Sequence, residues 1–150
     1  MPTATTTETA FWDTSGIALL CVDQPSTHVA RRIARRCRRM VVWWGMPVEA
    51  RSAFARLMRE GALSSAGFSH ATKRLESLHR AASEILPTDQ LRELAQGLLD
   101  VHDLRAADAL QLAASLVLCR EKPRGRWFVC FDRRLSDAAS RAGFTVLPAL

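Results

Sequence analysis

The stretch LRAADALQLAASLVL, residues 104–118, decides the fold of this chain, because it reads as one long apolar helix. Its apolar residues cover more than one helical face, so we expect this helix to be packed on two sides. Asp108 interrupts the stretch in its first turns. An ionised carboxylate among apolar neighbours is unfavourable unless it is paired or binds a cation. Taken alone, Asp108 is best explained as a helix-capping acid or as the partner of Arg105.

Three other acids occur in comparable settings. Asp13 ends the apolar stretch AFWD, and Asp132 ends the apolar stretch WFVCFD. Glu49 follows the apolar run MVVWWGM, in the first turn of a predicted helix where the helix dipole alone would favour an acid. Acids at strand ends, or at the starts of the helices that follow, gather along the edge where α/β sheets bind ligands. We therefore predict that these three acids and Asp108 converge at one edge of a sheet.

Short apolar segments alternate with helical patterns along the whole chain. The expected strands are 9–12, 40–46, 84–87, 127–131 and 144–147, and the expected helices are 17–22, 26–39, 47–61, 69–83, 88–99, 104–118 and 134–141. Parallel strands need long crossover connections, which these helices supply. The sequence predicts an α/β fold, a three-layer α/β/α sandwich with a central, mainly parallel sheet. We expect residues 1–9 to be a flexible N-terminal segment and residues 10–150 to form one domain.

The chain is basic, with a formal net charge of +6, and almost all of its cations are arginines. Such a surface suits a phosphate-bearing or acidic partner. Before Met40 the predicted helix carries arginines whose like charges lie four residues apart, which favours a bound anion. Arg31, Arg35 and Arg38 are our candidates for substrate or partner binding. A solvated helix face explains these arginines equally well.

Four widely spaced cysteines form no C-x-x-C pair, which favours buried, reduced thiols over disulfides or a zinc site. The threonine-rich start of the chain lacks the pattern of a signal peptide, and no apolar run approaches the roughly 20 residues that span a bilayer. We therefore expect a soluble, cytoplasmic protein without a membrane partner.

Four motifs occur in a characteristic order: FWDTS at 11–15, VEARSA at 48–53, LRAADAL at 104–110 and FVCFDRRL at 128–135. From Ala10 to Pro148 the chain resembles the PIN-domain family, in particular the VapC-type ribonuclease toxins of type II toxin–antitoxin pairs. The resemblance implies a PIN-like fold, a quartet of acids binding Mg²⁺ or Mn²⁺, RNA cleavage that inhibits translation, a homodimer and an antitoxin that blocks the site. Gly16 replaces the usual alanine and Gln111 the common histidine, but neither departure removes an acid.

The chemistry of the acids follows without the resemblance. Clustered carboxylates repel one another, so four together require a divalent cation near neutral pH, and oxygen ligands select Mg²⁺ or Mn²⁺. Such a cation activates a water and neutralises charge at a phosphodiester. The candidate catalytic and metal-binding residues are thus Asp13, Glu49, Asp108 and Asp132. The hydroxyl of Ser15 is expected to orient a carboxylate or a water, although an ordinary turn residue is an equally good explanation.

Other classes of small α/β protein fit less well. A phospho-receiver domain needs paired acids after the first strand and a lysine late in the sheet, whereas the only lysines are Lys73 and Lys122. A haloacid-dehalogenase-type phosphatase needs Asp-x-Asp, whereas Asp13 is followed by Thr14 and Ser15. The stronger alternatives keep the fold: a non-catalytic module that binds RNA or protein, and a housekeeping RNA-processing nuclease. Metal binding with turnover distinguishes the enzyme from the module.

Overall fold

A sheet of five short parallel strands lies at the centre of the described chain. The computed structural model describes residues 9–149. Its strands are β1 (Thr9–Trp12), β2 (Arg39–Trp43), β3 (Ser83–Ile85), β4 (Trp127–Val129) and β5 (Thr145–Leu147). Their order across the sheet is β3-β2-β1-β4-β5, and every neighbouring pair is parallel. The predicted parallel sheet is confirmed, with β1 at its centre.

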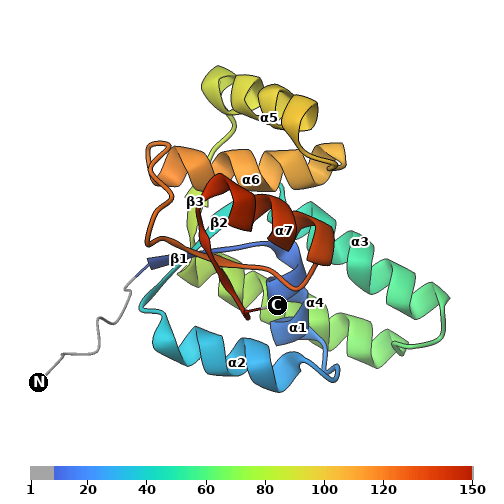
Figure 1. The fold of residues 1–150 in the computed structure, drawn as a ribbon. Helices are drawn as coiled ribbons and strands as arrows, with labels where there is room; N and C mark the ends of the chain where they lie inside the picture. Colours follow the sequence, from blue (N-terminus) through green and yellow to red (C-terminus); the bar gives the residue numbers. More distant parts are fainter. Residues whose placement is uncertain (1–8, 150) are drawn as a thin grey trace, which may run out of the picture.

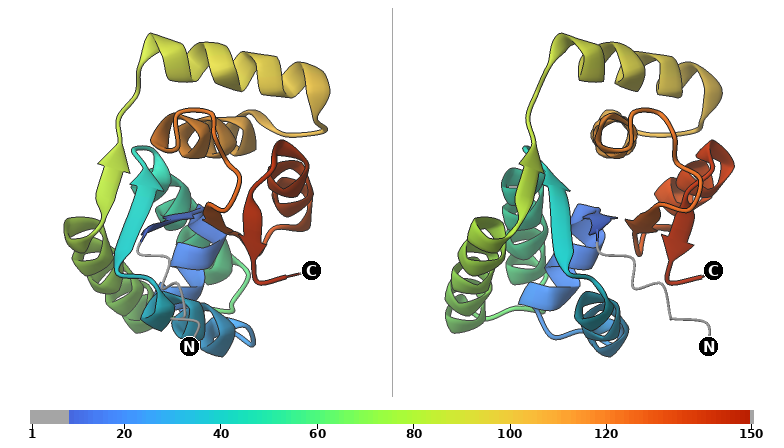
Figure 2. Two further views of the ribbon diagram at one scale, coloured as in Figure 1. Left: turned by 60° about the vertical axis from the view of Figure 1, so that its left-hand side comes forward. Right: turned by 90° about the vertical axis from the view of Figure 1, so that its left-hand side faces the viewer.

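Helices connect the strands and cover both faces of the sheet (Figure 1). They are α1 (Thr14–Cys21), α2 (Thr27–Arg36), α3 (Met46–Arg59), α4 (Ser65–Ala81), α5 (Asp89–Val101), α6 (Ala106–Leu118) and α7 (Arg133–Ala142). One apolar core lies between the sheet and α1 to α4, and a second lies between the sheet and α5 to α7. The two further views show these layers on opposite sides of the sheet (Figure 2). The predicted three-layer α/β/α sandwich is therefore confirmed.

The central strand β1 contributes to both cores because successive side chains of a strand point to opposite faces. Phe11 belongs to the core under α6, where its ring stacks on Phe128 with 5.4 Å between the centroids. Ala10 and Trp12 belong to the other core. A strand buried on both faces reads as a continuous apolar run, which is why the sequence predicted β1 with its observed bounds.

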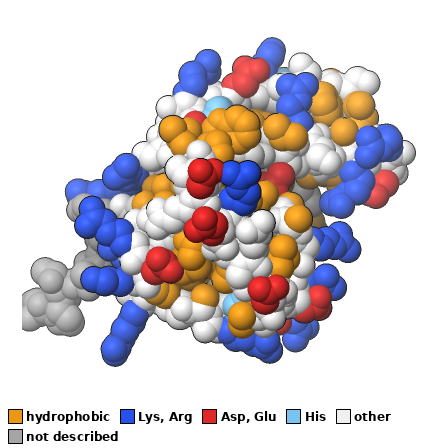
Figure 3. All heavy atoms as spheres, turned by 90° about the horizontal axis from the view of Figure 1, so that it is seen from above, with side chains coloured by type: hydrophobic (Ala, Val, Ile, Leu, Met, Phe, Trp, Pro, Cys, Tyr) orange, Lys and Arg blue, Asp and Glu red, His pale blue; other side chains and the backbone are white. Residues whose placement is uncertain are grey.

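The helix α6 is packed on two sides, as its apolar pattern predicted. Leu112 and Ala109 lie in the core against the sheet, together with Leu91 and Ala95 of α5. α5 lies along the outer side of α6 (Figure 2). Seen from above, from the side of α5, hydrophobic, acidic and basic side chains are interspersed over the surface (Figure 3). The apolar helix α6 is thus buried between the sheet and α5.

Several predicted boundaries are wrong. The helix predicted over 26–39 ends at Arg36, because Cys37 is extended and Arg39 already pairs with Thr9 in the sheet. Arg38 therefore does not lie on the helix. The strand predicted over 40–46 ends at Trp43, and α3 begins at Met46. Of the segment predicted to be flexible, Thr9 begins β1, and residues 1–8 lie outside the described residues.

The four cysteines are free, as predicted, although Cys37 is only partly buried. Within residues 9–149, no helix has both the length and the apolar character needed to cross a membrane.

Candidate active site

The carboxyl ends of β1, β2 and β4 meet at one edge of the sheet because these strands are parallel neighbours. Asp13 follows β1 directly and is the N-cap residue of α1. Glu49 lies in the first turn of α3, after β2, and Asp132 is the N-cap residue of α7, after β4. Asp108 lies in the first turn of α6. Each of the four predicted acids thus stands at the start of a helix, where the helix dipole favours a carboxylate.

The four acids interact electrostatically with one another. Burial raises the pKa of Asp13, and the charge of Asp108 raises it further. Burial also raises the pKa of Asp108, to which the charge of Asp132 adds. The pKa of Glu49 is raised to about 7, by burial first and then by the charges of Asp13 and Asp108. Neighbouring like charges make ionisation unfavourable, so the structure places these carboxylates within electrostatic reach of one another at this edge of the sheet, in what we call the acidic site.

Ser15 links Asp13 to the loop that follows β4. The Ser15 hydroxyl donates to Oδ2 of Asp13 at 2.6 Å, and the Ser15 backbone amide donates to the same oxygen at 3.1 Å. The Ser15 hydroxyl oxygen accepts a hydrogen bond from the backbone amide of Phe131 at 2.8 Å. The Cys130 thiol lies 3.5 Å from Oδ2 of Asp13. Asp13, of which 5% is exposed, is thus held by neutral groups from the start of α1 and from the segment after β4.

Gln111 holds Glu49 in place from the neighbouring helix, a role that the sequence did not reveal. Its Nε2 donates to Oε2 of Glu49 at 2.7 Å and to Oγ1 of Thr14 at 2.8 Å. The Thr14 hydroxyl donates to the same Glu49 oxygen at 3.0 Å. These bonds tie α6, α1 and α3 together at the site. The available signal was a glutamine within an apolar helix, three residues after Asp108 and so on the same helical face.

Asp108 and Asp132 also serve the ends of their own helices. Oδ1 of Asp132 accepts a hydrogen bond from the backbone amide of Leu135 at 2.9 Å. A hydrogen bond from the backbone of Arg105, and the positive charges of Arg105 and Arg134, oppose the rise in the pKa of Asp108. The helix-capping explanation of Asp108 therefore holds beside its place in the acidic site.

The acids offer the right donor chemistry for a hard cation but are not arranged as a finished metal site. Within residues 9–149, no three His, Cys, Asp or Glu side chains form a group that could hold a metal ion. Asp13 and Glu49 instead turn to neutral hydrogen-bond donors inside the protein. Their ligand atoms are carboxylate oxygens, which suit Mg²⁺ or Mn²⁺. The carbonyl oxygen Oε1 of Gln111 is buried beside Glu49 and accepts no hydrogen bond from a described residue. The oxygen ligands of these residues therefore suit such a cation in kind, although the described side chains are not grouped around one.

The candidate arginines are not at the acidic site. The end of α2 and the start of β2 lie at the amino edge of the sheet, where the guanidinium of Arg36 stacks 5.0 Å from the centre of the Trp127 ring. Arg35 and Arg38 belong to this region, opposite the acids. Nη2 of Arg31 forms an exposed ion pair with Oδ1 of Asp23 at 2.9 Å. A role of these arginines in binding stays a prediction.

Comparison with solved structures finds the same fold in three proteins. VapC20 of Mycobacterium tuberculosis, described as a sarcin-ricin loop cleaving toxin, is 23% identical, with a TM-score of 0.64 over 91% of this chain and 96% of that chain. PAE2754 from Pyrobaculum aerophilum is 17% identical, with a TM-score of 0.59 over 97% and 93% of the two chains. FitAcB from Neisseria gonorrhoeae is 16% identical, with a TM-score of 0.63 over 91% and 96%.

No family model matches the sequence, and no curated protein matches it. The structural likeness covers nearly the whole chain in each comparison, at low sequence identity. It agrees with the order of the four sequence motifs and with the parallel sheet. The described chain therefore has the three-layer, PIN-like α/β/α fold that its motifs implied.

Proposed function

We propose that this protein is a metal-dependent endoribonuclease and the toxin of a toxin–antitoxin pair. The observation that carries the proposal is the mutual electrostatic effect of Asp13, Glu49, Asp108 and Asp132 at the carboxyl edge of the sheet. A position at a helix start explains each acid singly, but it does not explain why the charges of these acids raise one another's pKa. A divalent cation that they hold together would explain why they do.

The chain supplies the scaffold of the proposed reaction. Bound Mg²⁺ or Mn²⁺ would supply an activated water and would neutralise charge at the phosphodiester. Asp13 and Asp108 are the proposed main ligands, with Glu49 and Asp132 beside them. Ser15 fixes the Asp13 carboxylate, and Gln111 with Thr14 fixes that of Glu49. Donors that hold each carboxylate in one orientation reduce the reorganisation needed when substrate binds.

The similar fold of VapC20, a toxin that cleaves the sarcin-ricin loop, supports RNA as the substrate class. The motif resemblance to VapC-type toxins supports inhibition of translation, a homodimer and a cognate antitoxin as the partner.

The test compares wild type with Asp108→Asn on a mixed RNA substrate, with Mg²⁺, with Mn²⁺ and with chelator. Asparagine keeps the size of the side chain and its capping ability, so the variant should fold. It removes the charge that would hold the cation, so the cleavage rate should fall by roughly a thousandfold or more, equivalent to about 4 kcal/mol of transition-state stabilisation. Asp103→Asn is the matched control. The substitution removes a nearby acid whose side chain is 92% exposed and whose Oδ2 lies 3.8 Å from Nε of Arg134. The Asp103→Asn variant should cleave RNA like wild type.

Wild-type cleavage that persists in chelator, or an Asp108→Asn variant as active as wild type, contradicts the metal-nuclease proposal. RNA or protein binding without turnover would then favour the non-catalytic module. Growth arrest on expression, relieved by a protein encoded beside this gene, would distinguish the toxin from a housekeeping nuclease.

A further inference from the structure

A polar cleft of about 390 Å³ runs between α1 and α3, directly beside the acidic site. Thr14 and Ser15, the two residues that bind Glu49 and Asp13, line one end of it. Its remaining lining includes Gln24, Ser26, Arg56 and Phe131. Because the same two hydroxyl residues belong to the cleft and to the site, a molecule in this cleft would lie next to the carboxylates.

Helix geometry explains why the cleft extends away from the acids. Glu49 and Arg56 are seven residues apart on α3, so they lie on the same helical face, two turns or about 10 Å apart. Ala53 lies between them and lines the cleft. Ala18 lines it from α1, one turn after Thr14. Two small side chains thus leave room between a carboxylate at one end and a guanidinium at the other.

Three polar side chains in the cleft form no side-chain hydrogen bond or ion pair with the part of the chain that the structure describes. Ser26 occupies the N-cap position of α2, but its hydroxyl forms no capping bond. Across residues 9–149, the side chains of Gln24, Ser26 and Arg56 take part in no hydrogen bond or ion pair with another described residue. Convergent polar groups without internal partners, next to a chemical site, are what a ligand-binding cleft presents.

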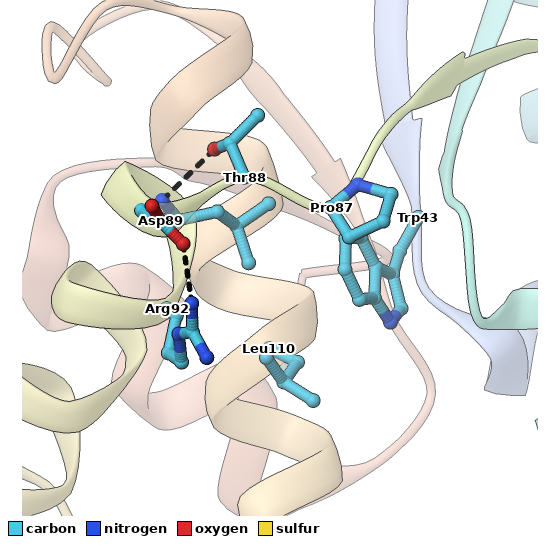
Figure 4. A pocket seen from close by; sticks show the side chains of 7 residues that line it. Trp43, Pro87, Thr88, Asp89, Arg92 and Leu110 are labelled. Atoms are coloured by element: carbon cyan, nitrogen blue, oxygen red, sulfur yellow. Dashed lines mark hydrogen bonds and ion pairs between the residues drawn. The ribbon is translucent and has the colours of Figure 1, made fainter.

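The other well-formed cleft near this edge differs in this respect. It has a volume of about 320 Å³ and is walled by Trp43, Pro87 and Leu110 (Figure 4). Its polar groups are already paired, because Thr88 caps α5 and the Arg92 guanidinium binds the Asp89 carboxylate. This second cleft offers an apolar wall rather than free donors, so it does not suit a polar ligand.

We propose that the cleft between α1 and α3 binds the nucleotide that neighbours the cleaved bond and so sets the nucleotide preference of the enzyme. Arg56 binds a phosphate, since a guanidinium matches phosphate oxygens with two parallel hydrogen bonds. The Gln24 amide, which has both donors and an acceptor, reads the edge of the base, and the half-buried ring of Phe131 provides a stacking surface. This assignment rests on the proposed ribonuclease function and names a part of its substrate recognition.

The first test measures binding without cleavage. The full-length protein is titrated in chelator, without divalent cations, with a ten-nucleotide RNA of mixed sequence, and fluorescence anisotropy gives the affinity. Arg56→Gln should weaken binding by about tenfold or more, because it removes a charge-assisted contact. Arg59→Gln is the matched control, since it removes the same charge from the same end of α3 but from outside the cleft, and it should weaken binding less than threefold or so. Equal losses in the two variants overturn the proposal.

The second test maps the cut sites of wild type and Gln24→Ala in a randomised RNA. The variant should lose or change the nucleotide preference beside the cut. An unchanged preference overturns the assignment of Gln24 as the reading residue. If neither Arg56→Gln nor Gln24→Ala changes RNA binding, the cleft is not an RNA site, and a protein segment is left as its occupant.

The binding test separates this inference from the proposed function. If Arg56 governs RNA binding but Asp108 has no effect on cleavage, the cleft stands and the metal-nuclease proposal fails. If Asp108 governs cleavage but Arg56→Gln binds RNA like wild type, the cleft assignment alone fails.

Discussion

At the scale of single residues, the absence of a side chain at Gly16 allows Trp12 to fill the core beneath α1. Trp12 is completely buried between the sheet and the helices on its face. A Cβ atom added at Gly16 would lie 2.9 Å from Cε3 of Trp12 and 3.4 Å from Cγ1 of Val129. The glycine that departs from the motif's usual alanine therefore accommodates the large ring four residues earlier.

Gly16→Ala should destabilise the protein by roughly 1–2 kcal/mol in urea unfolding. Overpacking a core costs about 1–3 kcal/mol, and alanine regains up to about 1 kcal/mol through its better helix propensity. In a Trp12→Phe background the added methyl has more room, so its cost should shrink, and a double-mutant cycle would measure the coupling. A neutral or stabilising Gly16→Ala in the wild-type background would contradict this explanation.

The acids were predictable one by one, whereas the residues that hold them were not. Asp13, Glu49 and Asp132 follow apolar strands, and local pattern is enough to place such positions at one edge of a parallel sheet. Gln111 contacts Thr14 across 97 residues of sequence, and no local pattern encodes such a pair. Likewise, the polar cleft depends on how α1 and α3 pack, which the sequence of neither helix reveals.

At the scale of elements, α2 has one buried and one arginine-rich face, as its sequence predicted, but it ends earlier. Thr27, Ala30 and Ile33 are buried, so the helix is fixed by a narrow apolar stripe. The arginine pattern continues at Arg38 and Arg39, after the helix has ended, because strand pairing takes precedence over helix continuation there. The arginines thus span a helix, a loop and a strand start.

Replacing Arg31, Arg35 and Arg38 together by glutamine should weaken RNA affinity and reduce its salt dependence. Each lost phosphate contact lowers the slope of log affinity against log salt by about 0.7 for single-stranded RNA, so three contacts would lower it by about 2. Because Arg35 and Arg38 lie at the opposite edge of the sheet from the acids, the rate constant for cleavage of bound RNA should stay unchanged.

The control for this variant removes the same charge elsewhere: Arg74 and Arg80 of α4 and Arg120 after α6, all exposed, become glutamine. If the two triple variants lose affinity and salt slope equally, the arginines of α2 form a solvated surface with no binding role of their own.

At the scale of the whole molecule, the layer order was predictable and the element boundaries were not. Alternating strand and helix patterns with long crossovers permit few arrangements other than a parallel sheet covered on both faces. Ends such as that of α2 at Arg36 are set by tertiary contacts, since Arg39 already pairs with Thr9 of β1. Sequence patterns therefore predict the architecture more reliably than they predict where each element stops.

The acidic site couples the stability of the whole fold to pH and to divalent cations. The pKa of Glu49 is about 7 in the folded chain and has a reference value of 4.5, and the pKa values of Asp13 and Asp108 are raised as well. The folded protein therefore binds more protons than the unfolded chain between these two pH values. The contribution of Glu49 protonation to stability in chelator is fully present below about pH 4.5 and is lost as the pH rises through about 7.

Urea unfolding in chelator should accordingly give a free energy of unfolding that falls by roughly 1–3 kcal/mol between pH 5 and pH 8. Glu49→Gln removes the carboxyl group whose pKa is raised to about 7, so the stability of this variant should depend less on pH than that of wild type. Mg²⁺ binds the ionised carboxylates and not the protonated ones, so it should stabilise wild type strongly near pH 8 and weakly near pH 5. Because protons and cation compete for the same oxygens, a Mg²⁺ effect that is equal at both pH values would mean that the cation binds elsewhere. If the stability of wild type in chelator depends on pH no more steeply than that of Glu49→Gln, then protonation of Glu49 is not what relieves the repulsion among these acids.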